Sequence, residues 1–163
     1  MSKIKSAGSA MLDTGFLIRL LKSDDSLHTS AKQYFQYFLE KDYTLYVSTI
    51  AIAEYCVKGN LSELPFANVR VIPFNLDHAR LAGEFAACLY EERLKGEFNP
   101  EQRIIIPNDT KMFAQADLTQ IEFFVTTDTN SLKPINKLAE SKGFTVRHLD
   151  IHKPIQQSLG VLF

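Results

Sequence analysis

Apolar segments with the spacing of strands alternate along this chain with segments that have the spacing of helices. A strand that is followed by a helix and then by another strand forms a crossover connection, and such connections join parallel strands. The chain is therefore predicted to be an α/β protein, a doubly wound domain whose mainly parallel central sheet is covered by helices on both faces. The predicted strands are residues 10–13, 43–48, 68–74, 121–127 and 144–150.

The segments between these strands have apolar residues at every third or fourth position, which is typical of helices with one buried face. The third of them stops at Gly59, a residue type that favours helix ends. Residues 96–108 are predicted to be the main loop. The predicted helices are residues 14–22, 28–41, 49–59, 77–95, 109–118 and 131–143.

Length and charge restrict the kind of protein. A chain of 163 residues predicts a single compact domain, residues 1–163. Its formal net charge of −1 argues against coating nucleic acid by bulk attraction but leaves a local basic patch possible. Two cysteines without a metal-binding spacing, and no signal peptide, predict a cytoplasmic protein. No apolar run approaches the length of a membrane span, so no membrane partner is expected.

In a doubly wound sheet, ligands bind at the carboxyl ends of the strands, so acidic residues there are the candidates for a functional site. Asp13 follows the apolar residues of the first strand and precedes the first helix. One interpretation is an N-cap, because an aspartate side chain accepts hydrogen bonds from the first free N–H groups of a helix. The other interpretation is a functional carboxylate.

Glu54 lies in a predicted helix whose other side chains are nearly all apolar or small. At about 100° per residue it shares a helix face with Ile50 and Val57. A surface glutamate normally has polar neighbours, so this one is predicted to point inward. The competing interpretation is a buried ion pair with an arginine.

Asp109 and Asp128 complete the set. Asp109 stands at a predicted helix start, where it or the preceding Asn108 is a possible cap, yet it shares a face with apolar residues of that helix. Asp128 follows an apolar strand and stands beside Thr126 and Thr127. An ordinary turn explains Asp128 equally well.

Together these signals predict four inward-looking carboxylates at separate junctions of one sheet. Negative charges within about 4–6 Å raise one another's pKa values, so such a cluster is tolerated mainly when a cation fills it. Oxygen ligands select hard cations, and a few carboxylates around a partly hydrated ion suit Mg²⁺ or Mn²⁺. Such an ion activates water and neutralises charge on a phosphoryl group.

Four segments in this order resemble the PIN domain, a family of metal-dependent ribonucleases that includes the bacterial toxins of VapC type. They are MLDTGFLIRLL, VSTIAIAEYCVKG, PNDTKMFAQA and FFVTTDTNSL, which together span most of the chain. The resemblance implies a three-layer Rossmann-like fold, an acidic Mg²⁺ or Mn²⁺ site and hydrolysis of RNA phosphodiester bonds. It also implies a cognate antitoxin that binds as an inhibitor.

Carried over by position, the resemblance implies that Asp13, Glu54, Asp109 and Asp128 are the catalytic, metal-binding acids. Thr14 would be the usual hydroxyl neighbour of the first acid, and Thr127 would support the fourth.

The sequence departs from the family pattern at three places. Gly15 stands where the family usually has Asn or Ser, which would loosen support of the first acid. Residues 91–108 look longer than in compact toxins. Asn130 is placed to share the role of Asp128.

The mechanism expected from this set is metal-assisted hydrolysis. Asp13, Glu54 and Asp109 would hold one ion, and Asp128 would help to hold a second ion or orient water. The ion would polarise the scissile phosphate while activated water attacks in line. Because the acids repel RNA, basic side chains at the rim are expected to contact the phosphates. On position alone, the candidates are Arg19, Lys22, Lys111 and Lys133.

Other acidic α/β proteins fit less well. A haloacid-dehalogenase-type phosphotransferase needs a second aspartate two residues after the first, where this chain has Gly15. A phosphoacceptor receiver domain needs adjacent acids after its first strand, and Asp13 stands alone there.

The alternative from another class is a PIN-like binding or assembly module without catalytic turnover. The second predicted helix has four clustered aromatic residues that cannot all face one core, namely Tyr34, Phe35, Tyr37 and Phe38. The resulting apolar surface would suit a homodimer or an antitoxin groove.

Overall fold

The computed structural model describes residues 7–94, 106–128, 143 and 146–160. Its centre is a five-stranded sheet with the order β3-β2-β1-β4-β5, in which every neighbouring pair is parallel. This is the doubly wound α/β fold predicted from the alternation of elements. The strands are β1 (Ser9–Leu12), β2 (Thr44–Ser48), β3 (Arg70–Ile72), β4 (Phe123–Thr126) and β5 (Arg147–Asp150).

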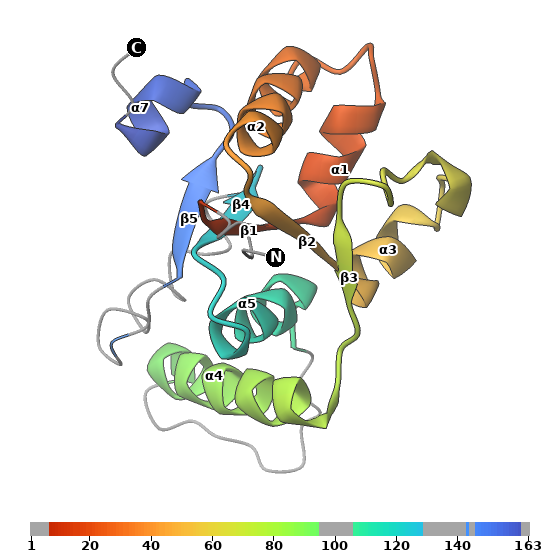
Figure 1. Cartoon of the computed structure of the whole chain (residues 1–163). Coiled ribbons are helices and arrows are strands. Elements are labelled where there is room, and N and C mark those ends of the chain that lie inside the picture. The colour runs from red at the N-terminus through yellow and green to blue at the C-terminus, as the bar shows by residue number, and fades with distance from the viewer. Residues whose placement is uncertain (1–6, 95–105, 129–142, 144–145, 161–163) are drawn as a thin grey trace, which may run out of the picture.

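Helices cover both faces of the sheet. Figure 1 shows α1 and α2 on one side and α4 and α5 on the other, while α3 packs against α1 and β2. No helix among the described residues is long and apolar enough to cross a membrane. The helices are α1 (Thr14–Leu21), α2 (His28–Glu40), α3 (Thr49–Tyr55), α4 (Leu76–Leu94), α5 (Asn108–Leu118) and α7 (Ile155–Leu159), with a short 3₁₀ helix, η1 (Leu61–Glu63).

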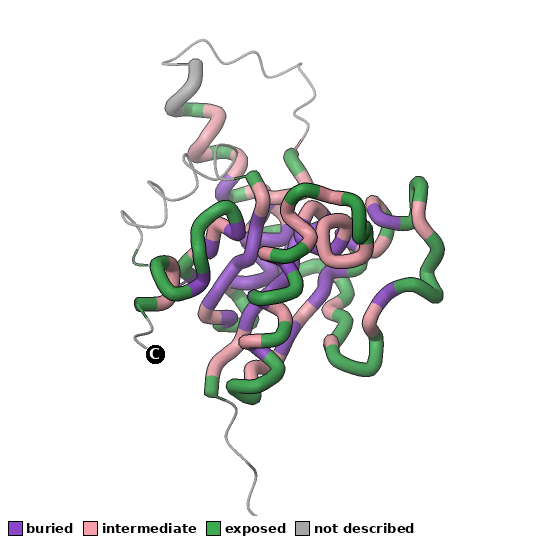
Figure 2. Tube along the Cα trace, turned by 90° about the horizontal axis from the view of Figure 1, so that it is seen from above, coloured by how far each residue is buried: buried purple, intermediate pink, exposed green. Residues whose placement is uncertain are grey.

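The core lies around β1 and β4. Met11 and Leu12 of β1 and Phe124 and Val125 of β4 have no exposed surface. Figure 2 shows buried segments gathered at the centre of the molecule, with exposed segments around them. Strands that are covered on both faces need continuous apolar runs, which is why this part of the sequence contains few polar residues.

Several boundaries differ from those predicted. The helix predicted over 49–59 ends at Tyr55, and the chain continues to Gly59 in turns. These turns contain hydrogen bonds with helix-like spacing, such as Gly59 N–H to the Tyr55 carbonyl, and they therefore show a helical pattern in the sequence. The short elements α7 and η1 were not predicted, since neither is long enough to show a periodic pattern. The helix predicted over 131–143 and most of the loop predicted over 96–108 lie outside the described residues.

The four aromatic side chains of α2 are more fully buried than predicted. Tyr34 and Phe38 are buried, and Phe35 and Tyr37 are half-buried against the core. Ring-to-ring contacts with Tyr43 account for much of this packing. Part of the apolar surface expected on this helix is present, since Phe35 lines a hollow together with Leu20 and the exposed Leu39.

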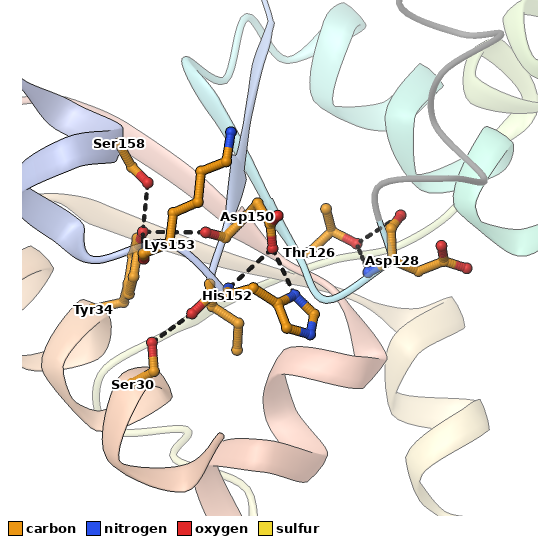
Figure 3. A network of polar contacts seen from close by, with 9 residues as sticks. Ser30, Tyr34, Thr126, Asp128, Asp150, His152, Lys153 and Ser158 are labelled. Carbon is orange, nitrogen blue, oxygen red and sulfur yellow. Dashed lines mark hydrogen bonds and ion pairs between the residues drawn. The ribbon is translucent and has the colours of Figure 1, made fainter. Parts of the chain in front are cut away.

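The segment after β5 is fixed to α2 by polar contacts (Figure 3). The Tyr34 hydroxyl lies 2.7 Å from both the Lys153 carbonyl oxygen and Ser158 Oγ. The Ser30 hydroxyl donates to the Ile151 carbonyl at 2.5 Å. These contacts attach α7 and the end of β5 to the same layer of helices as α1.

Candidate active site

The strand order changes direction between β1 and β4, and this switch point is where doubly wound sheets bind ligands. Asp13 lies there, directly after β1, and its backbone N–H donates to the Val125 carbonyl of β4 at 3.1 Å. Its Oδ1 accepts from the backbone N–H of Phe16 at 2.6 Å, so Asp13 is the N-cap of α1. The predicted cap is confirmed.

Asp13 is also a buried carboxyl group, with 4% of its surface exposed. Burial raises its pKa to about 6, and the nearby charge of Asp109 acts in the same direction. Hydrogen bonds from the Thr126 hydroxyl and from the backbone N–H groups of Phe16 and Thr127 oppose this rise in pKa. The ionised form of Asp13 therefore has neutral donors around it and a like charge close by.

Glu54 is held by two neutral donors. Its Oε2 accepts from the Thr14 hydroxyl of α1 at 2.5 Å, and its Oε1 accepts from the Asn108 side-chain amide of α5. The ion pair with an arginine was a wrong alternative, since no ion pair formed by described residues includes Glu54. Val57, predicted to share its face, lies beyond the end of α3 and is 78% exposed. Glu54 thus connects the start of α1 to the start of α5.

Asp109 lies in the first turn of α5 and is half-buried. The expectation that Asn108 or Asp109 caps this helix is wrong: the N-cap is Pro107, and no side chain caps the helix. The Asn108 amide reaches Glu54 instead, and Lys111 Nζ donates to Asn108 Oδ1 at 3.2 Å. The charge of Asp109 contributes to the raised pKa of Asp13, as expected for two carboxylates at the same edge of the sheet.

The end of β4 brings threonine hydroxyl groups to the candidate site, and it does not bring a buried carboxylate. Thr126 is fully buried, and its Oγ1 accepts from the Asp128 backbone N–H at 3.0 Å, which confirms the turn. Asp128 itself is exposed, so the prediction that it looks inward is wrong. Figure 3 shows Asp128 next to Thr126, with dashed lines between the Thr126 hydroxyl and the Asp128 backbone. Asn130 lies outside the described residues.

Thr127 explains the glycine that departs from the family pattern. A Cβ at Gly15 would collide with Thr127 Oγ1. Because residue 15 has no side chain, the Thr127 side chain packs against the start of α1. The backbone N–H of Thr127 donates to Asp13. Gly15 is thus matched to Thr127 and does not leave Asp13 without support.

The four predicted basic contacts have different positions. Arg19 forms an ion pair with Asp25 at 3.2 Å, so its charge is already paired. Lys111 lies in the site through Asn108, and Lys22 is exposed beside a hollow that Glu54 also lines. Lys133 lies outside the described residues.

Asn108 is the site residue whose role was not predicted from the sequence. Its only local signal was its place before Asp109 at a helix start, which suggested a cap. Asp150 also lies at this edge of the sheet, since it ends β5 in register with Thr126. Its Oδ1 lies 2.7 Å from His152 Nδ1 (Figure 3).

The oxygen donors at the switch point suit a hard divalent cation. No group of three or more His, Cys, Asp or Glu side chains converges as a metal-holding set within the part of the chain that the structure describes. Mg²⁺, however, is commonly held by one or two carboxylates together with water and substrate phosphates. Asp13 and Asp109 supply such a pair, and a cation would offset both the burial of Asp13 and its repulsion by Asp109.

Solved structures share this doubly wound fold and identify it as the PIN-domain, VapC-like fold. A chain of VapBC2 from Rickettsia felis bound to a promoter DNA fragment is 19% identical, with a TM-score of 0.59, covering 87% of this chain and 99% of that one. A chain of DNA-bound VapBC from Salmonella typhimurium is 17% identical, with a TM-score of 0.54, covering 88% and 98%. A chain of a toxin–antitoxin complex from Klebsiella pneumoniae is 19% identical, with a TM-score of 0.53, covering 76% and 90%.

Comparisons by sequence add nothing to this likeness: no family model matches the chain, and no curated protein matches it.

Proposed function

We propose that this protein is a Mg²⁺- or Mn²⁺-dependent ribonuclease that hydrolyses RNA phosphodiester bonds. The observation that carries the proposal is the buried Asp13 beside Asp109 at the switch point of the sheet. A buried carboxylate with a second carboxylate beside it favours the binding of a cation, which offsets both the burial and the repulsion. The fold is shared with chains of toxin–antitoxin complexes. The sequence resemblance to the PIN domain implies metal-dependent hydrolysis of RNA, which agrees with this proposal.

In this proposal Asp13 and Asp109 hold the ion, and Glu54 fixes their surroundings through Thr14 and Asn108. A bound divalent cation supplies positive charge at the phosphate and makes water more acidic. Lys111, placed by Asn108, contacts a phosphate oxygen. Thr127 reaches Asp13 through its backbone N–H, and we propose that the exposed Asp128 next to it accepts a proton or orients water.

The biological role that we propose is the toxin of a toxin–antitoxin pair, with a cognate antitoxin protein as partner. The support is the assembly of the structural neighbours, which are VapBC and other toxin–antitoxin complexes. Induced expression in a bacterial host is expected to arrest growth, and Asp109→Asn is expected to abolish the arrest.

The experiment that tests the activity is cleavage of labelled single-stranded RNA with Mg²⁺, with Mn²⁺ and with EDTA, alongside DNA of the same sequence. Cleavage of RNA only with the metals, lost in Asp13→Asn and Asp109→Asn while circular dichroism stays native, is the expected result. Unchanged cleavage in both variants contradicts the proposal. A folded protein that cleaves nothing, and that divalent metal does not stabilise, is the outcome for a binding module without turnover.

A further inference from the structure

A hollow of about 530 Å³ lies next to the acidic site, between α1 and the residues of α3 and η1. Glu54 belongs to its wall, so the hollow and the acidic site share a carboxylate. Its apolar lining includes Ile18 and Leu21 of α1 and Tyr55 and Val57 on the other side. This volume lies within the range of small-ligand sites, which are mostly apolar with a few polar groups.

The aromatic ring in this wall is fixed in place. Tyr55 is 8% exposed, and its hydroxyl donates to Glu63 Oε2. Burial and the Glu63 carboxylate raise the pKa of Tyr55 to about 12, so the hydroxyl stays protonated and remains a donor at neutral pH. The ring also packs against Gly59, where any side chain would collide with it. The hollow therefore has a preformed aromatic wall.

Two lysines give the hollow positive charge at its rim. Lys22 and Lys58 both line it and are exposed, and neither takes part in an ion pair among the described residues. Arg19, also on α1, has its charge directed to Asp25. The cations available beside the hollow are thus two flexible ammonium groups, which suit contacts to phosphates without selecting a sequence.

We propose that this hollow receives the base of an unpaired nucleotide next to the cleaved phosphodiester bond, with Lys22 and Lys58 contacting the adjoining phosphates. The inference rests on the proposed ribonuclease activity. Glu54 lines the hollow and is hydrogen-bonded to Thr14 and Asn108, the sequence neighbours of Asp13 and Asp109. An RNA strand whose scissile phosphate lies at those two acids therefore has the hollow within reach. Unstacked bases commonly bind on aromatic and apolar side chains.

An apolar side chain of a protein partner would also fit the volume. The nucleotide is favoured because the hollow continues directly from the acidic site and because both of its cations are at the rim. Removal of one stacked base typically costs about 1–3 kcal/mol, and about 1.4 kcal/mol corresponds to a tenfold change. The effect of filling or emptying the hollow is therefore measurable in cleavage rates.

The test is a cycle of substrate and protein changes on an RNA with one mapped cleavage site. An abasic nucleotide on one side of that site is expected to lower kcat/KM about tenfold with the wild-type protein. Val57→Trp fills the hollow from an exposed position and is expected to lower kcat/KM by a similar factor with intact RNA. With this variant, kcat/KM is expected to be the same for intact and abasic RNA. Leu76→Trp, at a residue 84% exposed on α4, is the matched control and retains the full abasic effect.

The lysines are tested in the same assay. Lys22→Ala and Lys58→Ala are expected to raise KM and reduce its salt dependence while leaving kcat near the wild-type value. Lys32→Ala, an exposed lysine of α2 that lines a different hollow, is expected to change neither.

A second measurement does not need cleavage. The four ribonucleoside 5′-monophosphates are titrated into labelled protein, and the methyl signals of Ile18, Leu21 and Val57 are followed by NMR. If nucleotides shift these methyl signals but the protein cleaves no RNA, the hollow is supported as a nucleotide site. The proposed ribonuclease activity is then wrong, and the nucleotide site is not. Metal-dependent cleavage without such shifts and with additive abasic and Val57→Trp effects overturns the inference. If Val57→Trp releases a co-purifying protein and no nucleotide shifts these methyls, the hollow is a protein groove and the inference is also wrong.

Discussion

The ends of β1 and β5 have the same local arrangement in different surroundings. Each has an aspartate whose side chain accepts a backbone N–H a few residues later: Asp13 from Phe16, and Asp150 from His152. Asp13 follows the central strand and is 4% exposed, whereas the Asp150 side chain, on the edge strand, is 18% exposed. The position of the strand in the sheet, central or at the edge, therefore determines the solvent exposure of each carboxylate.

Their charged neighbours differ as well. The ionisable group close to Asp13 is Asp109, which has the same charge, while Asp150 Oδ1 lies 2.7 Å from the ring of His152. The His152 ring thus contacts Asp150 from within the described chain, whereas the charged neighbour that acts on Asp13 is a second carboxylate. The comparison teaches that Asp13, whose recorded charged neighbour is another carboxylate, is the better candidate of the two for binding a cation.

The largest difference between the two strand ends is expected in catalysis. Asp13→Asn and Asp109→Asn each remove a carboxylate proposed to hold the ion, and we expect kcat/KM for RNA to fall at least about 10³-fold. Asp150→Asn, the matched change at β5, is expected to lower it by less than about threefold. An equal loss in all three variants would show that the two strand ends do not differ in function.

The pH dependence of stability is expected to separate the two ends next. The pKa of Asp13 in the folded protein, about 6, lies above its value of 3.8 in a model peptide. Without metal, the folded state then binds more protons, and the free energy of unfolding falls by about 3 kcal/mol between pH 4 and pH 6.5. Below pH 4 this loss is absent, and above pH 6.5 it is complete.

Urea unfolding in EDTA across this pH range measures the effect. Asp13→Asn, which retains a capping side chain, is expected to remove this fall, and Asp150→Asn is expected to retain it. A fall of unchanged size in Asp13→Asn would mean that another group titrates.

A smaller effect is expected from the residue that holds Glu54. Asn108→Ala removes the amide donor to Glu54 and the acceptor of Lys111, so we expect kcat/KM to fall about 10- to 100-fold. Asn60→Ala, at the asparagine that caps η1, is the control and should lower only stability. Wild-type activity in Asn108→Ala would remove Glu54 from the proposed site.

The smallest effect is expected at the network behind β5. Tyr34→Phe deletes the hydroxyl near Lys153 and Ser158, and we expect the free energy of unfolding to fall by about 1–2 kcal/mol without a change in cleavage. Tyr37→Phe, on the same helix and half-buried, is the control, since its hydroxyl has no recorded hydrogen bond within the described chain. A loss of activity in Tyr34→Phe would connect this edge to the catalytic site.

Features that depend on nearby residues were predictable from the sequence. The alternation of strands and helices gave the parallel sheet, and the apolar run before Asp13 indicated both its burial and its capping role. In each case the residues that decide the outcome lie within a few positions of one another.

Features that depend on contacts distant in the sequence were not predictable in the same way. The bond between Asn108 and Glu54 joins residues 54 positions apart, and it replaced the predicted cap. Asp128 was predicted to point inward, yet Thr126 binds its backbone and leaves its side chain exposed. The fit of Gly15 to Thr127 likewise depends on β1 and β4 being neighbours.

The most direct test of the account is the position of a bound divalent cation. Mn²⁺ is titrated into ¹⁵N-labelled protein, and paramagnetic broadening of the backbone amide signals is followed by NMR. We expect Thr14, Gly15 and Asp109 to broaden first, and Asp13→Asn combined with Asp109→Asn to abolish that broadening. Broadening that begins at Asp150 and His152, or that survives in the double variant, would contradict the assignment of the metal site to the junction of β1 and β4.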